Sequence, residues 1–316
     1  MQFVRTLGLG LRTRLLLPLS LLLAPACGAP APIRYSFTTA CATAAACGRV
    51  IASTCESGNR WAPDDGAWGG ERCTVTPKAV TCPPRVTHLV AGSASRDVYW
   101  QTPTAPAPSV GYPVVVLYQG SFYPPSTTWG AVAQSAPHGG YHQARLQALL
   151  LKHGFVVIAP TATLGVAWQT NSVLPWSVSS DRTFLDALFA AMQRGEFGRL
   201  DPHRWYATGI SSGGYMTSRM ALSYRGRFRA LAIQSGSWAT CMGLLCGVPD
   251  PLPADHPPTL FLHGRRDLTV PLSTAREYFD RLVAQGFTAQ IDIDEDASHE
   301  WLTIAPEAVT RWFECH

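Results

Sequence analysis

Charge of either sign is scarce in this sequence, which excludes a polyelectrolyte partner. Asp, Glu, Lys and Arg make up 15% of the 316 residues, and the formal net charge is +4. Three of the 25 basic residues lie in residues 1–26, a segment without acids or lysines, so the remainder carries 22 basic and 21 acidic residues. A chain so close to neutrality has no electrostatic footprint for nucleic acid, and we expect no nucleic-acid partner.

Long hydrophobic runs are also absent, apart from one short run near the start. Leu15–Leu23 is mainly apolar, but a bilayer span takes about 20 apolar residues. Basic residues precede this run and Ala24-Pro25-Ala26 follows it, an order typical of a signal peptide over residues 1–26. We therefore expect a secreted protein without a transmembrane segment. Cys27 also resembles a lipid-attachment site, so a lipid-anchored surface protein is the alternative.

The nine cysteines include no CxxC pair or CxxH cluster, so the sequence predicts no metal site. We also expect no cofactor. Cysteines of an exported chain are usually oxidised, and eight remain when Cys27 is set aside. The expected pairs are Cys73 with Cys82 and Cys241 with Cys246. The sequence leaves open how the remaining four pair among themselves: Cys41, Cys47, Cys55 and Cys315.

The chain changes character near residue 85. Residues 27–84 hold six of the nine cysteines and show little helical periodicity, which indicates a disulfide-stapled N-terminal extension. From residue 85 to residue 316, strands and helices alternate, a pattern typical of an α/β domain whose mainly parallel sheet has helices on both faces. The expected strands are Val86–Leu89, Asp97–Gln101, Pro113–Tyr118, Phe155–Ala159, Trp205–Thr208, Ala230–Gln234, Pro258–Leu262 and Ala289–Ile293. The expected helices are Tyr141–His153, Asp181–Arg194, Tyr215–Tyr224 and Leu272–Gln285.

Gly209-Ile210-Ser211-Ser212-Gly213 is the most informative stretch, because it matches the G-x-S-x-G nucleophile elbow between an expected strand and an expected helix. A serine hydroxyl is a weak nucleophile at neutral pH and must stand exposed on a tight turn where a histidine can take its proton. The sequence therefore predicts Ser211 as the nucleophile of an α/β-hydrolase fold. The alternative is an ordinary serine in a glycine-rich turn.

In that fold the acid and then the histidine follow the serine in the chain. Asp267 lies in the turn after the expected strand Pro258–Leu262, and His299 lies in the loop after the next helix and strand, so these two complete a predicted triad. Asp267 could instead cap the helix that begins near Leu272, and His299 could be a solvated loop residue. We expect His263 to pack at the strand end and to shape the Asp267 turn.

Acyl transfer also needs donors aimed at the developing oxyanion. The fold supplies one from the residue after the nucleophile, here Ser212, and one from the loop after the third strand. In that loop Gln119-Gly120 stands in place of the more usual His-Gly, and Ser121 is the expected donor. The alternative is that Gly120 merely permits a tight turn.

With these residues in place, the chain resembles the exported medium-chain-length polyhydroxyalkanoate depolymerases of the poly(3-hydroxyoctanoate) type. The resemblance covers about residues 73–316. The matching segments are Leu117–Phe122, Trp168–Asn171, Tyr206–Arg219, Phe228–Ala232, Leu252–Gly264 and His299–Trp301. It implies Ser211, Asp267 and His299 as nucleophile, acid and base, and a water-insoluble polyester as the substrate. The block Ala31–Gly70 departs from the family pattern and leaves the contacts with the polymer surface open.

Aromatic residues near the strand ends fit such a substrate, and Phe122 and Trp168 are the expected contacts. Most tryptophans belong to the core, so the alternative for Trp168 is a packing role.

Two other functions compete with a polyester hydrolase. One is a feruloyl or acetyl xylan esterase of the same fold, which fold alone cannot separate. The other is a non-catalytic surface protein, against which the complete triad argues.

Overall fold

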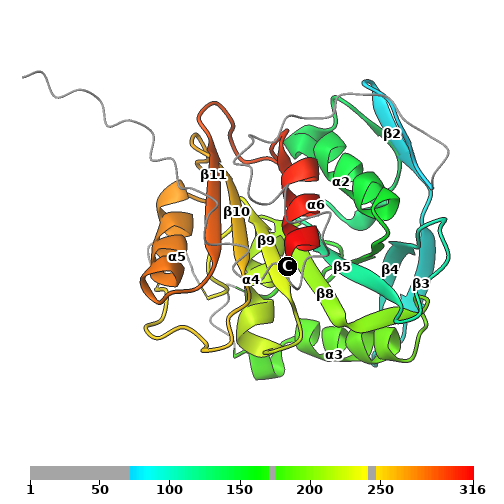
Figure 1. Ribbon diagram of the computed structural model, residues 1–316, viewed down its shortest axis with the longest axis horizontal. Helices are drawn as coiled ribbons and strands as arrows, with labels where there is room; N and C mark the ends of the chain where they lie inside the picture. The colour runs from blue at the N-terminus through cyan, green and yellow to red at the C-terminus, as the bar shows by residue number, and fades with distance from the viewer. Residues whose placement is uncertain (1–71, 171–174, 241–246) are drawn as a thin grey trace, which may run out of the picture. The chain divides into compact units, whose positions relative to one another are not determined.

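The computed structural model describes residues 72–170, 175–240 and 247–316 (Figure 1). The predicted signal peptide, the lipid-attachment site at Cys27 and the pair Cys241–Cys246 lie outside the described residues, as do Cys41, Cys47 and Cys55. Within the described ranges, no helix combines the length and the hydropathy that a bilayer crossing requires.

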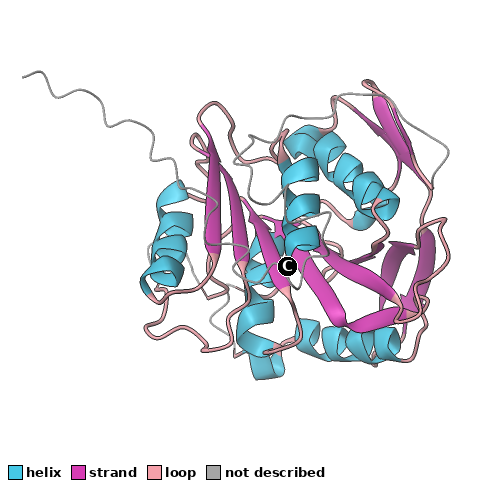
Figure 2. Ribbon diagram, in the orientation of Figure 1, coloured by secondary structure: helices cyan, strands magenta, loops and turns pink. Residues whose placement is uncertain are grey.

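A central sheet of eight strands in the order β11-β10-β9-β8-β5-β7-β4-β3 organises the chain (Figure 2). The six strands from β11 to β7 are parallel, and β4 and β3 continue the sheet antiparallel. This confirms the predicted mainly parallel α/β sheet. The strands are β3 (Arg85–Leu89), β4 (Arg96–Gln101), β5 (Tyr112–Tyr118), β7 (Val156–Pro160), β8 (Leu200–Ile210), β9 (Ala230–Gln234), β10 (Thr259–Gly264) and β11 (Ala289–Asp294).

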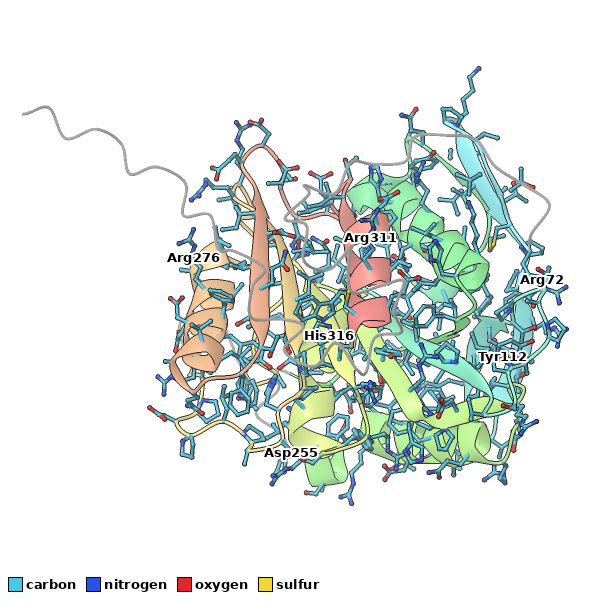
Figure 3. The ribbon with its side chains drawn as sticks, in the orientation of Figure 1. Arg72, Tyr112, Asp255, Arg276, Arg311 and His316 are labelled. Carbon is cyan, nitrogen blue, oxygen red and sulfur yellow. A yellow bond between two sulfur atoms is a disulfide. The ribbon has the colours of Figure 1, made fainter. Side chains whose placement is uncertain are left out.

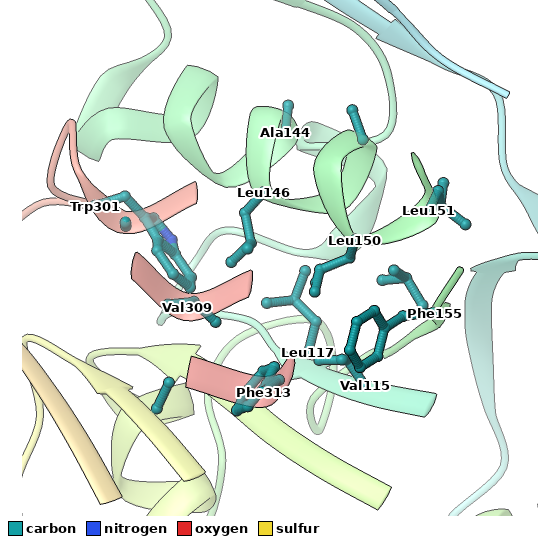
Figure 4. Close-up of a cluster of buried hydrophobic side chains, with 14 of the residues drawn as sticks. Val115, Leu117, Ala144, Leu146, Leu150, Leu151, Phe155, Trp301, Val309 and Phe313 are labelled. Carbon is teal, nitrogen blue, oxygen red and sulfur yellow. The ribbon is translucent and has the colours of Figure 1, made fainter. Parts of the chain in front are cut away.

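Helices cover both faces of this sheet, as the alternation of apolar side chains along the strands requires. On β5, Val115 and Leu117 point into a core formed with α2 and α6, shown in Figure 4. Val114 and Val116 point to the opposite face and pack against α3 and α4. The helices are α2 (Gly140–Lys152), α3 (Ser180–Gln193), α4 (Ser212–Ser223), α5 (Leu272–Ala284) and α6 (Ala305–Cys315).

Two parts of the fold were not expected from the sequence. One is a small antiparallel sheet of β1 (Thr74–Val75), β2 (Ala79–Cys82) and β6 (Gly130–Ala133), which packs on α2. Its strands are too short for alternation to reveal them. The other is α6, whose second residue is Pro306, a residue type that the first helical turn tolerates. β1 and β2, at the end of the Cys-rich extension, thus share a sheet with β6, which lies after residue 85.

The predicted bridge between Cys73 and Cys82 is present and joins β2 to the residue before β1 (Figure 3). Both cysteines are buried in the core that β1 and β2 share with α2. A bridge between residues nine positions apart lowers the conformational entropy of the unfolded chain and thereby stabilises the folded state by about 3 kcal/mol. Cys315 at the end of α6 is also disulfide-bonded.

Candidate active site

Ser211 stands on a strained turn between β8 and α4. Its backbone has φ 56° and ψ −123°, a region that costs a residue with a side chain about 1–3 kcal/mol. Two backbone hydrogen bonds hold it there. The Ser211 N–H donates to Gln234 O at 3.1 Å, and the Tyr215 N–H donates to Ser211 O at 3.0 Å. The predicted nucleophile elbow is therefore formed, although its helix begins at Ser212 and not at Tyr215.

The two glycines of the elbow are required by close packing against β5. A Cβ on Gly209 would lie 2.6 Å from the carbonyl oxygen of Tyr118, and a Cβ on Gly213 would lie 2.5 Å from that of Gln119. Real Cβ atoms do not approach backbone oxygens so closely. Any other residue at either position would force β5 and the elbow apart.

Asp267 and His299 meet over the carboxyl end of the sheet. The His299 Nδ1–H donates to Asp267 Oδ2 at 2.7 Å, so Nε2 is the ring nitrogen left to accept a proton. Asp267 Oδ1 accepts the N–H groups of Thr269 at 2.9 Å and Val270 at 2.8 Å. Asp267 is 3% exposed. Burial raises the pKa of its carboxyl, but the hydrogen bonds from His299 and Val270 outweigh burial, and the net pKa is lowered, which keeps the group ionised.

The neighbouring titratable residues have hydrogen-bond partners outside this pair, although His263 Nε2 also lies 3.4 Å from Asp267 Oδ2. His263 is buried, and its Nε2–H donates to Val270 O at 2.9 Å, so it braces the turn that carries Asp267. Burial lowers the pKa of His263, which keeps the ring neutral. The Glu300 carboxylate accepts the N–H of Ser298 within its own loop at 3.0 Å. The structure thus pairs His299 with Asp267, as predicted.

The loop after β5 passes beside Ser211. A Cβ on Gly120 would lie 3.8 Å from the Cβ of Ser211. The side chain of Gln119 fixes this loop to the loop after β7, because it accepts from Ala162 N at 2.9 Å and donates to Gly165 O at 3.0 Å. Ser121 follows directly, and Ser212 begins α4, where backbone N–H groups lack partners within the helix.

The two predicted substrate contacts lie in different surroundings. Phe122 belongs to the same loop after β5, is 75% exposed and has a left-handed backbone with φ 64°, so its ring lies at the surface. Trp168 is 3% exposed, and its indole N–H donates to Gln119 O at 3.2 Å. The structure therefore corrects the expectation for Trp168, which packs in the core and holds the Gln119 loop in place.

Sequence reasoning missed two residues that contact the His299 loop. The His138 Nδ1–H donates to His299 O at 3.2 Å, and the two imidazole rings are edge to face with centroids 6.4 Å apart. Gln234 donates to Glu300 O at 2.8 Å. His138 lies 161 positions from His299 and Gln234 lies 66 positions from Glu300, so no local pattern could indicate either contact.

Among the described residues, no group of three or more His, Cys, Asp or Glu side chains is arranged to hold a metal ion.

Comparison with known proteins identifies the family. No family model matches the chain. The chain is 47% identical to a poly(3-hydroxyoctanoate) depolymerase of Pseudomonas fluorescens over 249 residues, which are 78% of this chain and 89% of that protein. The chain belongs to the poly(3-hydroxyoctanoate) depolymerase family. It is therefore an ester hydrolase, as the sequence predicted.

A solved esterase structure places this family member in the α/β-hydrolase fold. Esterase 2 of Thermogutta terrifontis, phosphorylated by paraoxon, superposes with a TM-score of 0.52 at 16% identity, covering 72% of this chain and 90% of the esterase. An acylaminoacyl peptidase of Pyrococcus horikoshii gives a TM-score of 0.49 at 14% identity. The match covers 72% of this depolymerase-family chain but 39% of the peptidase.

The Asp267→Asn variant of this depolymerase-family chain should lose on the order of 10⁴-fold in turnover. Thr269 and Val270 both donate to Oδ1, so the asparagine oxygen takes that position and its NH₂ group faces His299. Nδ1 must then accept a hydrogen bond, which moves the proton to Nε2 and removes the base. Turnover of a p-nitrophenyl ester measures the loss, with Glu300→Gln as the matched control. Equal losses in both variants would show that Asp267 is not the acid.

Proposed function

We propose that this chain hydrolyses the ester bonds of poly(3-hydroxyalkanoates) with medium-length side groups, such as poly(3-hydroxyoctanoate), through an acyl-enzyme on Ser211. The observation that carries the proposal is the 2.7 Å hydrogen bond from His299 to buried Asp267. This pair lies at the carboxyl ends of the parallel strands, where the Ser211 elbow also lies. The polyester substrate follows from the named activity of the Pseudomonas fluorescens relative.

The reaction divides into two transfers of the acyl group. The Ser211 hydroxyl attacks the ester carbonyl while His299 Nε2 takes its proton, and the imidazolium then donates that proton to the leaving alcohol. Asp267 stays ionised and stabilises the imidazolium through Nδ1. A water molecule, deprotonated by His299 in turn, releases the 3-hydroxyacyl acid and restores Ser211. In both transfers the backbone N–H groups of Ser212 and Ser121 hold the oxyanion.

An apolar rim of Phe122, Leu164 and Val166 supports a water-insoluble substrate. Phe122 is 75% exposed, Leu164 is 91% exposed and Val166 is 38% exposed. The Phe122 N–H donates to Val166 O at 2.7 Å, so the loops after β5 and β7 form one continuous rim. Contact with the alkyl groups of a polymer would remove this apolar surface from water at about 25 cal/mol per Å². Phe122 is therefore the proposed substrate contact.

The proposal includes export of the protein. Residues 1–26 are proposed as a signal peptide, residues 27–84 as the Cys-rich extension and residues 85–316 as the catalytic domain. The expected location is extracellular, with residue 27 as the first residue of the mature chain. The N-terminal residue of the exported protein tests this cleavage site.

The Ser211→Ala variant should lose clearing of a poly(3-hydroxyoctanoate) emulsion and hydrolysis of a p-nitrophenyl ester, because the attacking atom is gone. We expect a loss of at least about 10³-fold, with a residue of activity from binding and the oxyanion donors. Circular dichroism and thermal unfolding should match the unmodified protein. Near-normal clearing by the folded variant would overturn the proposal. Release of ferulate or xylan acetate without clearing by the unmodified protein would overturn the substrate class alone.

The Phe122→Ala variant should separate polymer contact from chemistry. It removes an exposed ring but leaves Ser211, Asp267 and His299 intact, so polymer hydrolysis should fall about tenfold. Hydrolysis of p-nitrophenyl acetate, which lacks the alkyl side groups of the polymer, should change by less than about twofold. Val283→Ala on α5, where the side chain is 48% exposed, is the control for loss of an exposed apolar group. An equal decrease on both substrates would assign Phe122 to the fold.

A further inference from the structure

Residues 299–302, which begin with the proposed base His299, are hydrogen-bonded alternately to His138 and to Gln234. Four backbone groups between residues 299 and 302 are hydrogen-bonded to either His138 or Gln234. In chain order, His299 O accepts from His138 Nδ1 at 3.2 Å, Glu300 O accepts from Gln234 Nε2 at 2.8 Å, the Trp301 N–H donates to His138 O at 3.0 Å, and the Leu302 N–H donates to Gln234 Oε1 at 3.3 Å. The loop therefore has no freedom to shift sideways without breaking one set of bonds.

Gln234 also contacts the nucleophile. It is the last residue of β9, between β8 and β10 in the sheet, and it is 1% exposed (Figure 1). Its carbonyl oxygen accepts the Ser211 N–H at 3.1 Å, while its side chain is hydrogen-bonded to the backbone of Glu300 and Leu302. One rigid residue thus joins the strained elbow to the loop that carries His299.

We propose that Gln234 is a positioning residue that fixes the spacing between Ser211 and His299. The inference rests on the proposed function, in which His299 takes the proton of Ser211. Displacement of a reacting group by about 1 Å costs on the order of 10²-fold in rate, even when the residue responsible lies outside the chemistry. The role predicts a loss in turnover and not in substrate affinity, because Gln234 is buried behind the reacting groups.

The chemistry of the contact requires an amide. Besides the Ser235 hydroxyl, which lies 3.2 Å from its nitrogen, the side-chain amide faces two carbonyl oxygens, Glu300 O at 2.8 Å and Leu262 O at 3.0 Å, and one N–H, that of Leu302. An amide supplies two N–H donors and one acceptor oxygen, which matches this set. Methionine has the same length without these groups. A glutamate keeps the acceptor for Leu302 but, when ionised, cannot donate to either carbonyl.

The test compares Gln234→Met with Gln147→Met. Gln147 on α2 is also fully buried, and its Nε2 donates to Thr128 O at 3.0 Å, so its replacement removes a buried amide remote from the elbow. We measure kcat and KM for a p-nitrophenyl ester and the rate at which paraoxon phosphorylates each protein. Gln234→Met should lower kcat and the phosphorylation rate about 10²-fold with KM within about twofold. Gln147→Met should lower thermal stability and leave kcat unchanged.

Three results would overturn the inference: kcat of Gln234→Met within about twofold of the unmodified protein, equal decreases in both variants, or a decrease that appears only in KM. If Gln234→Met does not fold, Gln234→Glu repeats the measurement with the same expected loss. Failure of both to fold would make Gln234 a folding residue and would also count against the inference. A Ser211→Ala arm separates the two proposals, because its full activity would overturn the proposed function whatever Gln234 does.

Discussion

Ser211 can keep its strained backbone only while β5, β8 and β9 pack closely around the elbow. The strain costs about 1–3 kcal/mol, and the two backbone hydrogen bonds that hold it contribute about 0.5–1.5 kcal/mol each. These terms nearly balance, so the conformation depends on packing that forbids alternatives. Gly209 and Gly213 allow the carbonyl oxygens of Tyr118 and Gln119 to approach the turn. This close packing excludes other backbone conformations of the turn.

His299, the proposed base, depends on the same packing through a different set of contacts. Asp267 fixes one ring nitrogen of His299, while His138 and Gln234 fix the backbone that carries the ring. Because Gln234 also accepts the N–H of Ser211, a displacement of the elbow would reach the loop of the base through a single side chain. Ser211 and His299, the proposed nucleophile and base, are therefore parts of one hydrogen-bonded unit, although 88 positions separate them in the chain.

Much of this site could be predicted from the sequence because its signals are local. The elbow is a five-residue pattern between a strand and a helix, and the order of serine, acid and histidine is fixed by the fold. Asp267 and His299 could be placed because each follows a strand of recognisable composition. The large sheet was predictable for the same reason, since its strands are long enough to show their pattern.

The features that escaped prediction depend on contacts between distant segments. The small sheet needs the pairing of Ala79–Cys82 with Gly130–Ala133, which no pattern within either strand reveals. In the sequence Trp168 resembles an exposed aromatic residue of a loop, yet its ring is buried against Tyr118. The centroids of the two rings are 5.2 Å apart. His138 and Gln234 contact the backbone of the His299 loop. Backbone groups are the same for nearly every residue type, so the sequence of the loop does not indicate these contacts.

The central claim is that one serine, on the strained turn after β8, is the nucleophile. The most direct measurement is peptide mapping of the protein after reaction with paraoxon, which transfers a phosphoryl group to an activated serine. Our account predicts a single adduct, on Ser211, formed at the rate at which esterase activity disappears. An adduct on another residue, or full loss of activity with Ser211 unmodified, would contradict it.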